Sequence, residues 1–201
     1  MISATMLMPE RVEILSLDRQ EKTNPIRFGV LDVETRRSAA DVGGWHRAKD
    51  MGVSVAVLYD SGSDNFSSFT QERVPELAER LRELDLVVGF NISGFDYAVL
   101  GPHASVSWQD FPTLDMLVSL RKHLRYPVGL DKLAQSTLGT QKSADGFQAL
   151  AWWQEGAVDK IEEYCRQDVA VTRDLYLYGR EHGHLLFTNK AGQLVRVPAA
   201  W

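Results

Sequence analysis

Apolar and polar positions along the chain recur with two different periods, and these periods separate expected strands from expected helices. Short runs rich in apolar and β-branched residues predict strands at 28–35, 52–59, 65–69 and 86–90. Apolar residues at helical spacing predict helices at 72–84, 130–138 and 158–180, the last being the longest. The segment 112–124 combines a strand end with a helix, and a short helix is expected to start at Ser93 or Gly94.

The remaining segments show neither period. Residues 1–25 form a polar lead-in, in which 12–15 is a candidate edge strand. Residues 36–50 contain two adjacent glycines and break every periodicity, which predicts a loop between strands. Residues 139–157 are predicted to be irregular, and 184–197 to be a closing β-hairpin that turns at 190–192.

This order of elements predicts the fold class. A meander of antiparallel strands followed by alternating helices and strands indicates an α/β fold with a mixed central sheet flanked by helices. We expect a single domain over residues 26–201 that ends in a hairpin at about 183–198. Ligands of such sheets collect at the ends of the central strands, which directs attention to the end of the strand at 28–35.

Composition narrows the classes of protein. A hydrophobic content of 44% and a charged content of 24% are typical of a soluble globular protein, and no apolar run is long enough to span a membrane. The net charge of −5 argues against a non-specific nucleic-acid coat, but not against a nucleic-acid enzyme, because metal sites are built from acids. A single cysteine, Cys165, and no signal-peptide pattern predict a cytoplasmic protein.

Two carboxylates stand at the end of the first predicted strand. Because side chains alternate along a strand, Asp32 and Glu34 lie on the same face. Like charges this close are unfavourable unless a cation lies between them, and Mg²⁺ or Mn²⁺ prefers such oxygen ligands. The alternative is a strand that simply runs out into a polar turn.

Two later segments add carboxylates. Asp96 falls in the first turn of a helix that follows a buried strand, where the helix dipole alone also favours an acid. Tyr164 and Asp168 are four residues apart and share one face of the longest helix, with Asp168 in or beside its apolar stripe. A carboxylate turned toward a core is rare unless it is metal-bound or paired, here with Arg166 or Arg173.

Three motifs therefore occur in order: Asp32-x-Glu34, the turn from Asn91 to Asp96, and Tyr164-x-x-x-Asp168. Over about residues 26–180 the chain resembles the DEDD exonucleases of the RNase H-like, DnaQ-type superfamily, in the branch whose third motif carries a tyrosine. It resembles more closely the YprB-type predicted RNase H-like exonucleases. The histidine branch would place histidine five residues before the last aspartate, where this chain has Glu163. The family often follows its first motif with a short turn, whereas here the longer segment 36–50 intervenes.

The resemblance implies a 3′–5′ exonuclease that hydrolyses phosphodiester bonds at a single-stranded 3′ end, in DNA or RNA, and releases nucleoside 5′-monophosphates. It implies two divalent cations, Mg²⁺ or Mn²⁺, about 3.5–4 Å apart. Asp32 would bridge both ions, Glu34 and Asp168 would bind the ion that activates water, and Asp96 would support the second. Tyr164 would orient the attacking water, since its ordinary pKa of about 10 makes it a poor base.

Candidate substrate contacts surround these motifs: Thr35, Arg36, Arg37, Trp45, Asn91 and Lys142. The cations and the tryptophan of segment 36–50 match the composition of a single-strand groove, although a solvated loop explains them equally well. Two other functions stay open. One is a catalytically weak nucleic-acid-binding or partner-dependent nuclease module, with a helicase or another nucleic-acid-processing protein as partner. The other is an endonuclease of the same fold, for which different acidic spacing is expected.

Overall fold

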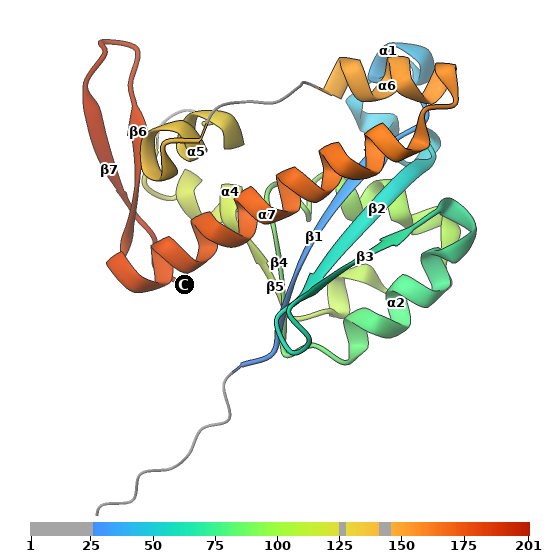
Figure 1. Ribbon diagram of the computed structural model, residues 1–201, viewed down its shortest axis with the longest axis horizontal. Coiled ribbons are helices and arrows are strands. Elements are labelled where there is room, and N and C mark those ends of the chain that lie inside the picture. Colours follow the sequence, from blue (N-terminus) through green and yellow to red (C-terminus); the bar gives the residue numbers. More distant parts are fainter. Residues whose placement is uncertain (1–25, 125–127, 141–145) are drawn as a thin grey trace, which may run out of the picture.

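A twisted sheet with helices on both of its faces forms the centre of the computed structural model (Figure 1). The structure describes residues 26–124, 128–140 and 146–201. The candidate edge strand at 12–15 and the candidate substrate contact Lys142 lie outside these residues. Within the described ranges, no helix is long and apolar enough to cross a membrane.

The central sheet has five strands in the order β3-β2-β1-β4-β5. Its strands are β1 (Phe28–Thr35), β2 (Val53–Asp60), β3 (Asn65–Phe69), β4 (Leu86–Gly89) and β5 (Thr113–Asp115). β2 pairs antiparallel with both β1 and β3, whereas β4 pairs parallel with β1 and β5. The predicted strands and the predicted mixed sheet are confirmed.

Among the residues that the structure describes, the C-terminal half of β1 has no pairing partner on its β4 side. β1 pairs with β4 only from Phe28 to Val30, but it pairs with β2 as far as Thr35. The second half of β1 therefore extends past the end of β4. Asp32 and Glu34 lie in this extension, next to the turn that leaves β4, which is where the sequence places a ligand site.

Seven α-helices occur in the described residues: α1 (Ala39–Val42), α2 (Val74–Arg82), α3 (Asp96–Leu100), α4 (Met116–Arg121), α5 (Leu130–Leu138), α6 (Gly146–Glu155) and α7 (Val158–His182). Short 3₁₀ helices cover Trp45–Asp50, Gln71–Arg73, Gly101–His103 and Trp108–Asp110. The chain closes with the hairpin of β6 (His184–Thr188) and β7 (Leu194–Pro198), as predicted. The short helix expected from Ser93 or Gly94 begins instead at Asp96.

Two segments predicted to lack regular structure are in fact helical. In segment 36–50, the Ser38 side chain accepts a hydrogen bond from the Asp41 amide, and the Asp41 carboxylate accepts one from the Ser38 amide. This capping box starts α1, and Gly43 ends it with a φ of 88°. The helix is too short to display a period, so the sequence pattern did not reveal it.

The prediction of an irregular segment at 139–157 is also wrong, because Gly146–Glu155 forms α6. Phe147 on this helix is exposed, Ala149 is buried, and both Trp152 and Trp153 are half-buried. The apolar side chains thus point in several directions. Without a single apolar stripe, helical spacing gave no signal.

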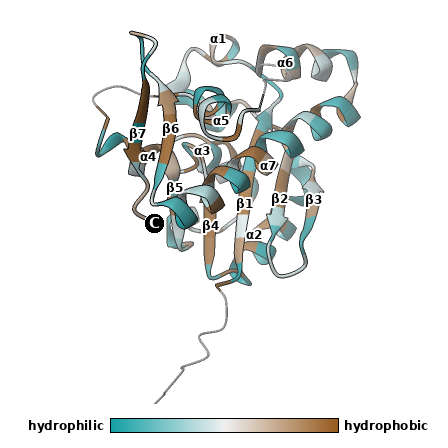
Figure 2. Cartoon of the chain, turned by 60° about the vertical axis from the view of Figure 1, so that its left-hand side comes forward, coloured by the Kyte–Doolittle hydropathy of each residue, from teal (hydrophilic) through white to brown (hydrophobic). Residues whose placement is uncertain are grey.

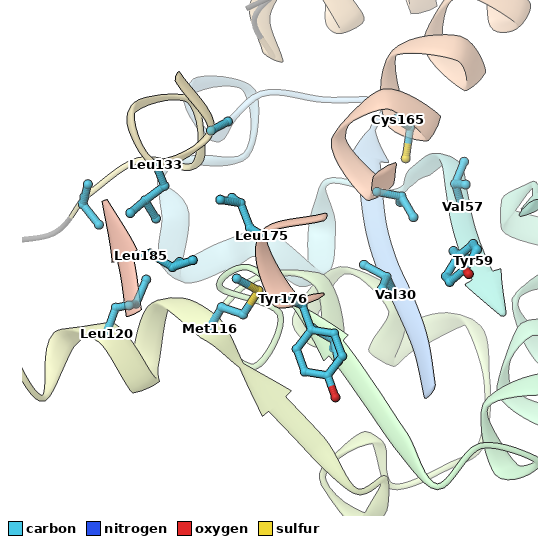
Figure 3. Close-up of a cluster of buried hydrophobic side chains, with 14 of the residues drawn as sticks. Val30, Val57, Tyr59, Met116, Leu120, Leu133, Cys165, Leu175, Tyr176 and Leu185 are labelled. Atoms are coloured by element: carbon cyan, nitrogen blue, oxygen red, sulfur yellow. The ribbon is translucent and has the colours of Figure 1, made fainter. Parts of the chain in front are cut away.

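Each face of the sheet has its own hydrophobic cluster. On one face, α7 packs against β1 and β2, and Figure 3 shows Cys165 and Tyr176 of this helix beside Val30 and Val57. The hairpin contributes Leu185, Phe187 and Val197 to the same cluster, and Figure 2 shows β6 as largely hydrophobic. The opposite face packs against α2 and α3. Since Asp32 and Glu34 alternate with residues of that opposite cluster, both point toward the α7 side.

Candidate metal centre

Three carboxylates converge where β1 meets α7. Asp32, Glu34 and Asp168 each offer an oxygen atom, and these atoms lie within 4.8 Å of one another. Strand alternation places the first two on the face that α7 covers, and α7 brings Asp168 to the same point. The arginines considered as alternative partners of Asp168 pair elsewhere: Arg166 with Glu162, at 3.1 Å, and Arg173 with Asp174, at 2.9 Å.

Asp96 lies beside this cluster of three. It is the first residue of α3, only 3% of its surface is exposed, and it lines the same cavity as the other three carboxylates. Burial raises its pKa well above the usual value, and the charge of Asp32 raises it further. The backbone amides of Asp96 and Val33 lower the pKa of this carboxyl, but burial and the charge of Asp32 outweigh them.

The same burial and crowding raise the pKa values of the cluster. The pKa of Asp32 is raised to about 7, first by burial and then by the charge of Asp168. The pKa of Glu34 is also raised well above its usual value, by burial and then by the charges of Asp32, Asp168 and Asp96. A donor set made only of carboxylate oxygens fits a hard divalent cation, and such a cation would relieve the repulsion that raises these pKa values.

Two side chains of α7 lie next to the carboxylates. Tyr164 stands one helical turn before Asp168, and burial, followed by the charges of Asp168 and Glu34, raises the pKa of its hydroxyl. Tyr164 is therefore neutral at physiological pH, so it can position a group by hydrogen bonding but cannot serve as a base. The Cys165 thiol lies on the buried side of the cluster, with its Sγ atom 3.5 Å from Oδ2 of Asp32.

A cavity of about 830 Å³ opens beside the carboxylates. Four of the predicted substrate contacts line it: Thr35, Arg37, Trp45 and Asn91. Arg36 does not, because its guanidinium donates hydrogen bonds to the Val53 carbonyl, at 2.6 Å, and to Glu72, at 3.2 Å, and lies over the Trp153 ring. The structure therefore brings together most of the predicted site, but it places Arg36 in the framework around it.

Aromatic residues that the sequence analysis did not select also line the cavity. Phe95 precedes Asp96, and its ring lies edge-on to Trp45 with centroids 5.8 Å apart. Phe147 of α6 also lines the cavity, with 80% of its surface exposed, and Trp45 is 72% exposed. Phe95 could have been found from its position next to Asp96. Phe147 could not be found in this way, because its segment, 139–157, is predicted from the sequence to be irregular.

Comparisons with known proteins agree with this architecture. The model of the family described as the RNase_H superfamily matches residues 30–178, so the chain belongs to the RNase H superfamily. Among solved structures, the family B DNA polymerase from the hyperthermophilic archaeon Pyrobaculum calidifontis is similar, with a TM-score of 0.58 and 19% sequence identity. That similarity covers 78% of this chain but only 25% of the polymerase chain, and at this identity it shows a shared fold. No curated protein sequence matches the chain.

Proposed function

We propose that this protein is a metal-dependent 3′–5′ exonuclease of the tyrosine branch of the DEDD group, related to the YprB-type proteins. It would shorten single-stranded DNA or RNA from the 3′ end and release nucleoside 5′-monophosphates. The observation that carries the proposal is the convergence of Asp32, Glu34 and Asp168 within 4.8 Å, with Tyr164 one helical turn from Asp168 on the same helix face. Membership of the RNase H superfamily supports the same reaction class.

The proposed cofactors are two Mg²⁺ or Mn²⁺ ions, held by Asp32, Glu34, Asp96 and Asp168. When bound, such a pair of ions supplies Lewis-acid stabilisation of the attacking and leaving oxygens of a phosphodiester. The chain's own contribution is to hold four carboxylates in place and to keep Tyr164 neutral, so that its hydroxyl positions the attacking water.

The walls of the cavity favour an unpaired strand as substrate. Trp45 and Phe147 are both largely exposed and both line the cavity, so each offers a flat surface on which an unpaired base can stack. Bases inside a duplex are already stacked and paired. Arg37, exposed at the same cavity, provides a cation for a phosphate. A volume of about 830 Å³ is of the size that binds ligands as large as nucleotides.

The net charge of the chain bears on which partner the protein would need. With a net charge of −5, the chain carries little general attraction for nucleic acid, and a helicase or another nucleic-acid-processing protein would supply the missing positive surface. We place the activity in the cytoplasm and assign it to one domain spanning residues 26–201, in which the hairpin shares the hydrophobic cluster of the sheet.

The test is degradation of 5′-labelled single-stranded DNA and RNA in the presence of Mn²⁺ or Mg²⁺. We expect a ladder that shortens from the 3′ end, and a loss of rate of at least about a hundredfold in Asp32→Ala and Asp168→Asn. Glu163→Gln is the matched control, because Glu163 lies on the same helix, is exposed and does not line the cavity. It is expected to retain full activity.

Other outcomes would redirect or overturn the proposal. Internal fragments, or cleavage of circular strands, would indicate an endonuclease instead. Mn²⁺ binding without cleavage of either strand would indicate a nuclease that needs a partner. If the protein neither binds metal nor cleaves, the catalytic assignment is wrong.

A further inference from the structure

The turn between β4 and α3 delivers Asp96 to the metal centre, and its backbone is constrained. Asn91 adopts a φ of 67°, a left-handed conformation that is uncommon outside glycine. The amides of Gly94 and Phe95 both donate to the Asn91 carbonyl, at 3.0 Å each. Such a conformation persists only where surrounding contacts hold it.

One buried carboxylate, Asp115, holds the turn from the neighbouring strand. It is the last residue of β5, is paired with Gly89 at the end of β4, and is 8% exposed. Its Oδ1 atom accepts a hydrogen bond from the Asn91 amide at 3.0 Å, and its Oδ2 atom accepts one from the Ser93 amide at 3.0 Å. Oδ1 also accepts from the Val118 amide at 3.2 Å, which caps α4.

This arrangement requires both oxygens of the side chain. An asparagine side chain at this position would keep one oxygen acceptor and replace the other with an NH₂ group. That group is a donor, and it would face the backbone amide of Ser93 or Asn91, which is also a donor. Asp115 does not itself line the cavity, so it can act on the site through the turn or through its charge, which raises the pKa of Asp96. Asp96 follows that turn directly, and its position relative to Asp32 depends on how the turn is held.

We propose that Asp115 is a positioning residue of the metal centre, which fixes the turn at Asn91 and Ser93 so that Asp96 faces the other three carboxylates. The proposal rests on the proposed function, because it assigns Asp96 to the second of two ions. It predicts a selective effect: loss of Asp115 weakens the ion that Asp96 supports and spares the ion held by Glu34 and Asp168.

The experiment is a calorimetric titration with Mn²⁺ of the full chain and four variants. We expect two ions in the wild type and weakened binding of one of them in the reference variant Asp96→Asn. Asp115→Asn and Asp115→Glu should each weaken the same ion by at least about tenfold, a typical effect of losing an outer contact of a metal ligand. The glutamate keeps the charge but displaces its oxygens, so it separates positioning from electrostatic attraction.

Asp60→Asn is the matched control. Asp60 is a buried carboxylate, 4% exposed, that accepts hydrogen bonds from Arg27 and from the Gly62 amide at the far end of β2. Its replacement should lower the melting temperature but leave both ions bound with wild-type affinity. A second readout is amide hydrogen exchange, which should accelerate at Asn91 and Ser93 in Asp115→Asn and stay unchanged there in Asp60→Asn.

The outcomes separate the two proposals. If the wild type binds two ions and both Asp115 variants bind them with wild-type affinity, the role of Asp115 is overturned while the proposed function stands. Wild-type affinity in Asp115→Glu alone would equally overturn it, since charge rather than position would then matter. If the wild type binds no Mn²⁺, the proposed function fails and the assignment of Asp115 fails with it.

Discussion

Two adjacent arginines illustrate how the partners of a side chain decide its function. Arg36 bonds to the Val53 carbonyl and to Glu72, and it stacks on Trp153 with 4.7 Å between its Cζ atom and the ring centroid. Arg37 is exposed and lines the cavity. The Arg36 cation therefore braces the framework, whereas the Arg37 cation lies at the cavity.

This difference predicts distinct effects on binding of a single-stranded oligonucleotide. In an Asp168→Asn background that does not cleave, Arg37→Gln should weaken binding and reduce the slope of log affinity against log salt by about 0.7, the effect of one lost phosphate contact. Arg36→Gln should leave the slope unchanged and lower the melting temperature, because it removes framework contacts. Fluorescence anisotropy at several salt concentrations measures the slopes. An equal change of slope in both variants would contradict the assignment.

At the scale of elements, α6 connects the cavity to the metal centre. Phe147 and Leu150 of this helix line the cavity, and Trp152 packs edge-on against Tyr164, with ring centroids 6.4 Å apart. Trp153 lies under Arg36 just after β1. One helix thus forms part of the cavity wall and packs against Tyr164.

The exposure of Phe147 allows its role in binding to be separated from any role in folding. Phe147→Ala should weaken binding of a single strand about 5- to 150-fold, the range given by about 1–3 kcal/mol for one stacked base. The melting temperature should hardly change, since the side chain is 80% exposed. Leu194→Ala is the control, because Leu194 is 63% exposed on β7 and does not line the cavity. Equal losses of affinity in the two variants would argue against stacking.

At the scale of the whole molecule, the cluster of carboxylates ties stability to pH. The fold brings Asp32, Glu34 and Asp168 together although burial and repulsion oppose it, so these contacts cost folding free energy in the absence of a cation. The pKa of Asp32 rises from 3.8 to about 7 on folding. The folded state therefore binds more protons than the unfolded state between these values.

The stabilising contribution of Asp32 is complete below pH 3.8 and is lost as the pH rises through about 7, so the metal-free protein should become less stable over this range. Mn²⁺ displaces the proton, and its apparent affinity should fall up to about tenfold per pH unit below 7 for each proton released. We expect Mn²⁺ to raise the melting temperature more at about pH 8 than at about pH 6.

Thermal unfolding with and without Mn²⁺, at both pH values, measures this linkage. Asp32→Asn is the informative variant, because it removes one titrating carboxyl and one metal ligand together. It should reduce both the pH dependence of stability and the stabilisation by Mn²⁺, while Glu34 and Asp96, whose pKa values are also raised, continue to titrate. An equal stabilisation by Mn²⁺ at the two pH values would show that no proton is displaced from the carboxylates. The contribution assigned to Asp32 would then be wrong.

Features that arise from covalent geometry could be predicted from the amino-acid sequence alone. Alternation along a strand placed Asp32 and Glu34 on one face, and helical spacing did the same for Tyr164 and Asp168. The periods also gave the strands of the central sheet, the longest helix and the closing hairpin, and hence the α/β class. These relations hold whatever surrounds the segment, which is why they can be predicted locally.

Which segments meet depends on long-range packing, and local sequence patterns could not predict it. α6 has no continuous apolar stripe and is held by contacts with distant residues, so its helix and the exposed Phe147 gave no local pattern. The different directions of Arg36 and Arg37 depend on the neighbours of β1. Asp115 reaches the amides of Asn91 and Ser93 because β5 pairs beside β4. A hydrogen bond between residues far apart in the chain depends on that pairing, and no period in the sequence encodes it.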